Sequence, residues 1–288
     1  MDINQKLIHL HHCRGAGWKT IKKIISIDPS LQSIFTRTLD EWKQFLPLPP
    51  NKLTEFYCDL HSINIQKLLK QYENNGISAL TIIDSDYPEL LKQIFDPPWV
   101  LYLKGDSCLL NSANGLGVVG ARKPSQYGAE ALNTLLPPLM KKNFVIISGL
   151  AAGIDEISHK IALKENGKTI GVLGGGHFHI YPKNNIPLGI EIMKKGALIS
   201  EIPPSRRPEP WMFAVRNRII SGLSRGVFVV EAKIKSGSLI TAQCALEQGR
   251  EVFALPGNIT SKESEGTNFL IKEGAKLVQS SSDIEEEF

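Results

Sequence analysis

The spacing of apolar residues changes once along the chain, near residue 79. Before that point, apolar positions such as Ile3, Leu7 and Leu10 recur at helical intervals, and no run has the β-branched content of a strand. We therefore predict a small all-helical domain over residues 1–75. After that point, short β-branched runs alternate with amphipathic segments, which predicts a second domain over residues 79–288.

The second domain has the alternation of strands and helices that is typical of a doubly wound α/β fold with a mainly parallel sheet. We expect strands at 79–83, 99–103, 116–119, 144–148, 169–173, 197–200, 226–231, 251–254 and 275–278. We expect helices near 126–136, 154–166, 187–195, 211–224, 238–248 and 267–273. Pro137-Pro138 should end or kink the first of these helices. The polar and acidic segment from Ser280 to Phe288 is expected to be disordered.

The helical domain contains a glycine-rich break, Arg14-Gly-Ala-Gly17, between two helical segments. Helix, glycine turn and helix resemble a helix-hairpin-helix motif, whose backbone amides can bind a phosphate. The same pattern is typical of a tight turn in any small helical domain. His9 and His12 share a helix face, but no distant cluster completes four ligands, so we predict no metal site.

The segment from Phe144 to His159 joins a buried strand to a helix through a turn of small residues. Such a turn, ending at the positive end of a helix, is suited to binding a phosphate. Its glycine spacing differs from the Gly-x-Gly-x-x-Gly pattern of dinucleotide-binding folds, and no acid follows the next strand. We therefore predict no nucleotide cofactor.

Ligands of an open parallel sheet bind beyond the carboxyl ends of its strands. The residues that follow the expected strands are rich in cations, glycines and hydroxyls. Cations and backbone amides suit phosphates, and aromatic side chains can stack on bases. The candidate site residues are Gly120, Arg122, Lys123, Ser148, Gly149, Leu150, Gly176, Phe178, His179, Lys183, Asn217, Arg218, Ser236 and Gly237.

For some of these residues, a structural role explains the sequence as well as contact with a ligand does. Arg218 lies in an apolar context and could pair internally with a carboxylate such as Glu231. Ser236 could cap the helix that follows it. Asp155 and His159 share a helix face and could act as acid and base, or Asp155 could cap the helix while His159 packs beside it.

Composition narrows the classes of protein without deciding between them. The formal net charge of +4 permits a polyanionic partner, and the 42% apolar content is ordinary for a globular protein. No apolar run has the ~20 residues of a membrane span. The four cysteines are scattered and the first residues lack the order of a secretion signal, so we expect a cytoplasmic protein without disulfides.

A resemblance to a known family rests on several motifs that follow one another in order. They are Gly120-Ala-Arg122, Ser148-Gly-Leu-Ala-Ala-Gly153-Ile-Asp155, Gly174-Gly-Gly176, Tyr181-Pro182, Arg216-Asn-Arg218, Ser236-Gly-Ser-Leu-Ile-Thr241 and Pro256-Gly257. Over about residues 79–279 this order resembles the DprA/Smf family of DNA-processing proteins. The helical region is similar to the family's sterile-alpha-motif-like domain, and we expect no C-terminal winged helix in this chain.

The resemblance implies an extended Rossmann fold and a non-catalytic homodimer that acts in natural transformation. Members of the family bind and protect incoming single-stranded DNA and load RecA onto it. By position, Arg122 and Lys183 match basic residues that hold the DNA backbone, and the loop from Phe178 to Tyr181 matches one that contacts bases. For self-association we suggest that the late apolar side chains Leu246 and Phe269 face a partner.

Two other functions stay open at this point. Related folds hydrolyse nucleoside phosphates, although their Pro-Gly-Gly-x-Gly-Thr loop is replaced here by Pro256-Gly-Asn-Ile-Thr260. The chain could also be a protein-docking scaffold whose contact with DNA is incidental.

Overall fold

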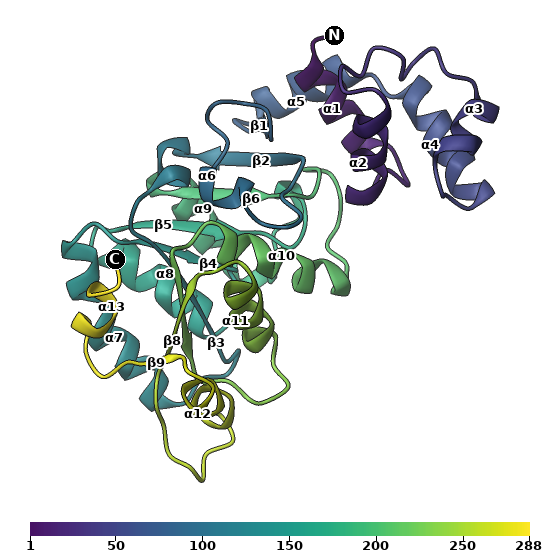
Figure 1. Ribbon diagram of the computed structural model, residues 1–288. Helices are drawn as coiled ribbons and strands as arrows, with labels where there is room; N and C mark the ends of the chain where they lie inside the picture. The colour runs from purple at the N-terminus through teal and green to yellow at the C-terminus, as the bar shows by residue number, and fades with distance from the viewer. The chain divides into compact units, whose positions relative to one another are not determined.

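The computed structural model describes residues 1–288, which form two compact units. The first unit contains Met1–Tyr87 and Asp96–Tyr102, and the second contains Pro88–Phe95 and Leu103–Phe288. Residues 79–87 and 96–102 therefore belong with the helices, although the sequence pattern grouped them with the sheet domain. Figure 1 shows the elements of each unit. None of the helices combines the length and apolar character that crossing a bilayer requires.

The first unit is built from five helices and a short strand. The helices are α1 (Ile3–His12), α2 (Trp18–Ile27), α3 (Leu39–Phe45), α4 (Pro50–Ser62) and α5 (Ile65–Asn74), and the strand is β1 (Ser78–Thr81). Asp2, Thr38 and Asn64 accept hydrogen bonds from amides in the first turns of α1, α3 and α5, so local sequence fixes where these helices begin. Their apolar faces enclose a core that includes Leu10, Trp42, Phe56 and Tyr72, which are almost fully buried.

The glycine-rich break and the histidines of the first unit have structural roles. Gly15 has φ +81°, a left-handed conformation that a residue without a Cβ adopts readily, and it connects α1 to α2. The Nε2 atom of His9 bonds to the carbonyl of Leu60 at 2.9 Å, and that of His12 to the hydroxyl of Tyr72 at 2.8 Å. No group of three or more His, Cys, Asp or Glu side chains in the chain could hold a metal ion.

The second unit has a parallel sheet whose strands lie in the order β6-β5-β4-β3-β7-β8-β9. Neighbouring strands in this series pair in parallel. Their bounds are β3 (Gly115–Gly120), β4 (Val145–Ser148), β5 (Lys168–Val172), β6 (Ala197–Ser200), β7 (Gly226–Val230), β8 (Glu251–Ala254) and β9 (Lys276–Leu277). Strand β2 (Val100–Gly105) contributes its last three residues to this unit. The predicted α/β fold with a mainly parallel, Rossmann-like sheet is confirmed.

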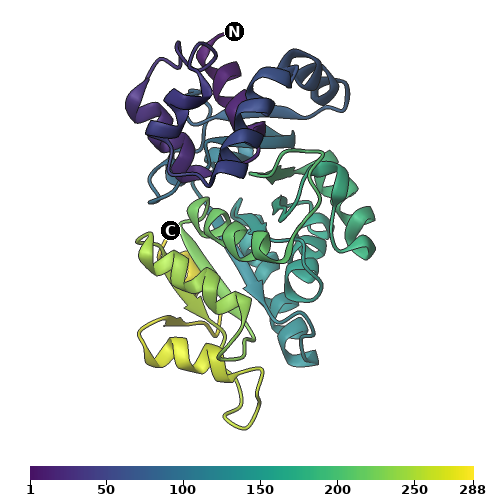
Figure 2. The same cartoon turned by 90° about the vertical axis from the view of Figure 1, so that its right-hand side faces the viewer.

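Helices cover both faces of this sheet (Figures 1 and 2). Val118 of β3 packs in the core beneath α7 and α8, whereas a Cβ on its neighbour Gly117 would lie 3.4 Å from Ile220 of α10. Successive residues of a strand point to opposite faces, so α7 and α10 lie on opposite sides. The helices are α6 (Glu89–Lys92), α7 (Gln126–Lys141), α8 (Ile154–Lys164), α9 (Ile186–Lys195), α10 (Pro210–Gly222), α11 (Gly237–Glu247), α12 (Glu265–Lys272) and α13 (Ser282–Glu285), with 3₁₀ turns η1 (Ser107–Asn111), η2 (His177–His179) and η3 (Lys183–Asn185).

Two local predictions were wrong, namely the end of the first helix at its prolines and the disorder of the C-terminal segment, whereas a kink at the prolines stays a prediction. Helix α7 does not end at Pro137-Pro138 but continues to Lys141. Leu135, Leu136 and Leu139 around the prolines are buried against the sheet, and this packing outweighs the hydrogen bonds that proline cannot donate. The segment from Ser280 to Phe288 is ordered and contains α13, because Ile284 is fully buried and Phe288 stacks beside Phe144 with ring centroids 4.7 Å apart.

Candidate functional site

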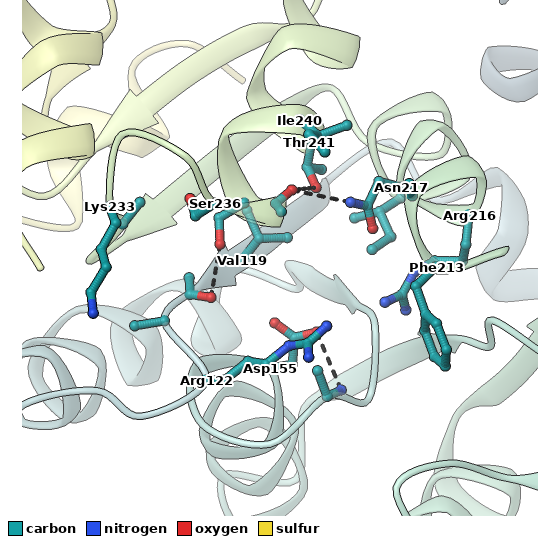
Figure 3. A pocket seen from close by; sticks show the side chains of 18 of the residues that line it. Val119, Arg122, Asp155, Phe213, Arg216, Asn217, Lys233, Ser236, Ile240 and Thr241 are labelled. Carbon is teal, nitrogen blue, oxygen red and sulfur yellow. Dashed lines mark hydrogen bonds between the residues drawn. The ribbon is translucent and has the colours of Figure 1, made fainter. Parts of the chain in front are cut away.

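A cavity of about 540 Å³ opens at the carboxyl edge of the sheet, above β3 and β7 (Figure 3). These strands are neighbours, but the chain leaves them in opposite directions, toward β4 on one side and β8 on the other. Ligands of doubly wound folds bind at such a reversal point. Gly120 is required here, because a Cβ on it would lie 1.9 Å from the carbonyl oxygen of Val230 in β7.

The floor of the cavity is a buried pair of opposite charges, Asp155 of α8 and Arg216 of α10. Each residue is only 7% exposed. Asp155 accepts hydrogen bonds from the amides of Gly149 (3.1 Å) and Ala151 (3.3 Å), and Arg216 donates from Nη1 to the carbonyl of Val172 at the end of β5. A Cβ on Gly149 would lie 2.0 Å from that Nη1. The pair therefore fixes the loops that follow β4 and β5.

Burial acts in opposite senses on the two members of this pair. It lowers the pKa of Arg216 to about 10, although the nearby Asp155 carboxylate raises it. It raises the pKa of Asp155, and Arg216 and the amide hydrogen bonds oppose that rise. The guanidinium therefore stays protonated at neutral pH. The carboxyl group of Asp155 is the acidic side chain that interacts electrostatically with it in the floor of the cavity.

The exposed cationic side chains of the site lie at the mouth of the cavity. Arg122 and Lys123 follow β3 and are exposed, and both line the cavity. The loop that carries them is held in place, because the amide of Ile154 donates to the carbonyl of Ala121 at 3.1 Å. Lys233 also lines the cavity, but its ammonium pairs with Glu263 at 2.9 Å. The mouth is therefore positive, mainly through Arg122 and Lys123.

The opposite wall is formed by α11 and α10. The hydroxyl of Ser236 caps α11 by accepting from the amide of Leu239 at 3.4 Å, and Ser238 donates to the carbonyl of Gly120 at 2.8 Å. The side-chain amide of Asn217 donates to the carbonyl of Gly237 at 3.1 Å. These bonds tie the start of α11 to β3 and α10, so small polar groups face the cavity in fixed positions (Figure 3).

Two residues at the ends of central strands have strained backbones. Leu150 after β4 has φ +57° and Glu231 after β7 has φ +56°, both in the left-handed region that disfavours side chains with a Cβ. Glu231 accepts hydrogen bonds from the amide and hydroxyl of Ser125, which caps α7. Strain of this kind concentrates at functional sites, and it agrees with a ligand position at this edge.

Comparisons with known proteins decide the family. The family model described as DNA recombination-mediator protein A matches residues 78–288. The chain is 45% identical over 270 residues to the DNA processing protein DprA of Bacillus subtilis, which covers 94% of this chain and 88% of the relative. This protein belongs to the DprA/Smf family. The resemblance inferred from the motifs is therefore confirmed.

Two solved structures of family members are similar to this fold. DprA from Streptococcus pneumoniae has a TM-score of 0.88 at 37% identity, with 100% of this chain and 99% of that chain covered. DprA from Helicobacter pylori, described for its single-stranded DNA binding mode, has a TM-score of 0.66 at 33% identity and covers 72% of this chain and 93% of that chain.

The structure distributes the candidate residues of this DprA/Smf protein between the cavity and its surroundings. The cavity is lined by Gly120, Arg122, Lys123, Asn217, Ser236 and Gly237. Lys183 does not line it but is exposed on η3, which lies close by because Asn185 donates to the carbonyls of Leu150 and Ala151 at 3.0 and 3.2 Å. Lys183 therefore lies near the loop that forms one side of the mouth.

Other candidates are engaged inside the protein. Ser148 is buried and donates to the carbonyl of Val118, and the side chain of Leu150 lies in a core cluster. Gly149 packs against the Arg216 guanidinium, and Gly176 against the carbonyls of Pro203 and Pro204. These residues can offer only backbone atoms to a ligand. In the base-contacting loop, Phe178 is 38% exposed, whereas His179 is bonded through Nε2 to the carbonyl of Ser205 at 3.0 Å.

Arg218 pairs with a carboxylate inside the protein, as its structural interpretation predicts, but the partner differs from the one suggested. Its Nη2 contacts both carboxylate oxygens of Glu201, at 2.7 and 2.9 Å, and the two side chains are 9% and 16% exposed. Glu231, the partner suggested from the sequence, is occupied by Ser125. His159 is buried and bonded to Thr169, as the packing alternative predicts, but Asp155 holds the preceding loop while Gly153 is the N-cap of α8.

The candidate residues taken from the sequence do not include Phe213 or Arg216, and the sequence indicates Asp155 only as an acid or a helix cap. Phe213, Arg216, Asn217 and Ile220 all line the cavity. Phe213 precedes Arg216 and Asn217 by three and four residues along α10, and these precede Ile220 by four and three. That spacing was visible in the sequence and could have indicated that one face of the helix forms a wall of the site.

Proposed function

We propose that this protein binds single-stranded DNA at the cavity and its mouth, and that it acts as a recombination mediator on strands taken up in natural transformation. The observation that carries the proposal is the cavity at the strand-order reversal, with the exposed cations Arg122 and Lys123 at its mouth. The Helicobacter pylori relative, described for its single-stranded DNA binding mode, supports the same ligand class.

Phosphates would supply most of the affinity. Arg122, Lys123 and Lys183 are exposed on adjacent loops and are suited to contact a strand's backbone. Each phosphate contact on a single strand steepens the dependence of log affinity on log salt by about 0.7. Bases stacked on aromatic side chains would add affinity with little sequence preference, and a duplex would withhold its bases from such contacts. The preference for single strands follows from this stacking.

We also propose that the protein changes no covalent bond. The acids near the cavity are already engaged, since Asp155 accepts from the amides of Gly149 and Ala151, Glu201 pairs with Arg218 and Glu263 pairs with Lys233. His159 is neutral, because burial and the charge of Arg216 lower its pKa to about 3. A general acid or base must reach the substrate, and these groups face protein partners.

The remaining parts of the proposal are a homodimer, loading of RecA and action in the cytoplasm. Leu246 on α11 and Phe269 on α12 are 54% and 46% exposed, so both could be covered by a second copy of the chain. A dimer would place two cavities on one strand and raise the apparent affinity through effective concentration. RecA loading would follow if the bound strand is passed on to the recombinase.

The test is salt-dependent binding of oligonucleotides to the double variant Arg122→Ala/Lys183→Ala. We expect the variant to remain folded, to bind a single strand more weakly, and to lose about 0.7 of salt slope for each phosphate contact removed. The matched control is Lys164→Ala/Lys194→Ala, which removes two exposed cations from the ends of α8 and α9. Unchanged affinity and slope in the first variant would reject the assigned interface.

A further inference from the structure

We propose that Trp211 is a base-stacking platform that extends the strand-binding site beyond the cavity. This inference rests on the proposed function and names a residue that the motifs did not select. The other tryptophans, Trp18, Trp42 and Trp99, all belong to the first unit, so Trp211 is alone in the second. It is 51% exposed, which is high for the side chain with the largest apolar surface.

The position of Trp211 places it at the edge of the cavity. Helix α10 begins at Pro210, and Pro210, Ala214 and Asn217 line the cavity. Trp211 precedes Ala214 by three residues, so the two side chains are neighbours on the helix surface. A strand leaving the cavity over this end of α10 would pass Trp211 first.

The indole is held in a defined orientation. Its Nε1 donates to the Glu209 carboxylate at 3.0 Å, and the same carboxylate accepts from Nη2 of Arg206 at 3.0 Å. The Arg206 guanidinium also lies over the indole, 5.8 Å from the ring centroid. Three side chains thus order one another at the surface. An aromatic ring ordered before binding loses less conformational entropy when a ligand stacks on it.

The charges around Trp211 suit a polyanion. Hydrogen bonds from Arg206 and from Trp211 lower the pKa of Glu209, so its carboxylate is ionised and bonded to both donors at neutral pH. Arg206 offsets that charge, and Arg207 beside it is exposed. Two arginines therefore lie beside an exposed aromatic ring, and this combination of cations and a stacking surface binds single strands without reading their sequence.

An aromatic pair joins the predicted base-contacting loop to α10. Phe213 lines the cavity, and its ring lies 5.6 Å from that of Tyr181, which is 57% exposed. The Phe213 ring also packs on Gly174, where a Cβ would lie 2.6 Å from its Cδ1 atom. Aromatic surface therefore continues from the loop to the wall of the cavity, and Trp211 adds a separate ring at the first turn of α10.

The experiment compares two 20-nucleotide probes, oligothymidylate and an abasic strand with the same sugar–phosphate backbone, in fluorescence anisotropy. We expect Trp211→Ala to bind oligothymidylate about tenfold more weakly, at the lower end of the effect of one lost base stack. The variant should bind the abasic strand like wild type, and the salt slope should not change, because the indole carries no charge. Trp211→Phe should retain most of the affinity. The control is Leu277→Ala, which removes another exposed apolar side chain. It should change neither the affinity for oligothymidylate nor the affinity for the abasic strand.

Intrinsic fluorescence provides an independent readout. Oligothymidylate should quench the emission of wild type and of Trp18→Phe, whereas Trp211→Phe should lose the quenching that depends on bases. If Trp211→Ala binds oligothymidylate like wild type, or weakens both probes equally, Trp211 is not a stacking platform. If wild type binds no single strand, the proposed function fails as well, so the two failures can be told apart.

Discussion

Replacement of Asp155 by alanine tests the claim that two buried groups of opposite charge, Asp155 and Arg216, organise the site. Asp155→Ala leaves the Arg216 guanidinium buried without its carboxylate. It also removes the acceptor of the Gly149 and Ala151 amides. The surrounding loops cannot easily solvate the guanidinium, because its Nη1 is bonded to Val172 and its planar group packs on Gly149.

The expected loss follows from these contacts. Removing the opposite charge that compensates a buried cation destabilises a protein by about 3–5 kcal/mol. The orphaned Gly149 amide adds about 1 kcal/mol, and the Ala151 amide adds less because water can reach this half-buried residue. We expect Asp155→Ala to lower the free energy of unfolding of the second unit by about 5 kcal/mol. Asp155→Asn should lose less, since its carbonyl oxygen can replace the single carboxylate oxygen that accepts both amide hydrogen bonds.

The assay is equilibrium unfolding in urea followed by circular dichroism, with the transition of each unit fitted separately. The control Glu73→Ala breaks an exposed pair with Lys70 and should leave the curve unchanged. The double variant Asp155→Ala/Arg216→Met should recover much of the loss, because it removes the unpaired charge. A loss below ~1 kcal/mol in Asp155→Ala, or no recovery in the double variant, would refute the reasoning.

Three further predictions concern pH, the C-terminal segment and self-association. Burial lowers the pKa of His177 to about 4 and of His159 to about 3, so the unfolded chain takes up protons that the native state does not. Stability should therefore fall from pH 7 to pH 5 by about 2 kcal/mol per histidine, and urea unfolding of His177→Gln should show a smaller fall. Phe288→Ala removes a half-buried ring from Phe144 and Phe253 and should lower the unfolding free energy by about 2 kcal/mol in the same assay. Leu246→Arg should convert a dimer to a monomer in light scattering, and an unchanged dimer mass would exclude this side chain from the interface.

The central strands could be predicted from the sequence because a parallel strand is buried on both faces. Runs such as Val145–Ser148 and Gly226–Val230 are apolar at every or nearly every position, which is the pattern of a strand buried on both faces. The residues at the carboxyl edge of the sheet could then be predicted as well, because each strand is followed directly by a loop at that edge. Arg122, Lys123 and Ser236 were found in this way.

Features that depend on tertiary packing could not be predicted in the same way. Local propensity disfavours prolines in α7, but the buried leucines around them decide the outcome. The C-terminal segment is polar on average, yet two apolar residues, Ile284 and Phe288, are enough to dock it. The partner of Arg218 could not be read either, because Glu201 and Glu231 both follow strands and only the fold shows which is near.

The walls of the cavity come from two separate stretches of chain, and this has a consequence for folding. Arg122 and Asp155 belong to the stretch that contains β3 and β4, whereas Ser236 and Thr241 belong to the stretch that follows β7. A nucleotide that touches both walls would be bound only when both stretches are folded. Occupancy would then stabilise the native state by mass action, by about 2.7 kcal/mol when free strand exceeds its Kd a hundredfold. A bound strand would thus protect the protein from unfolding.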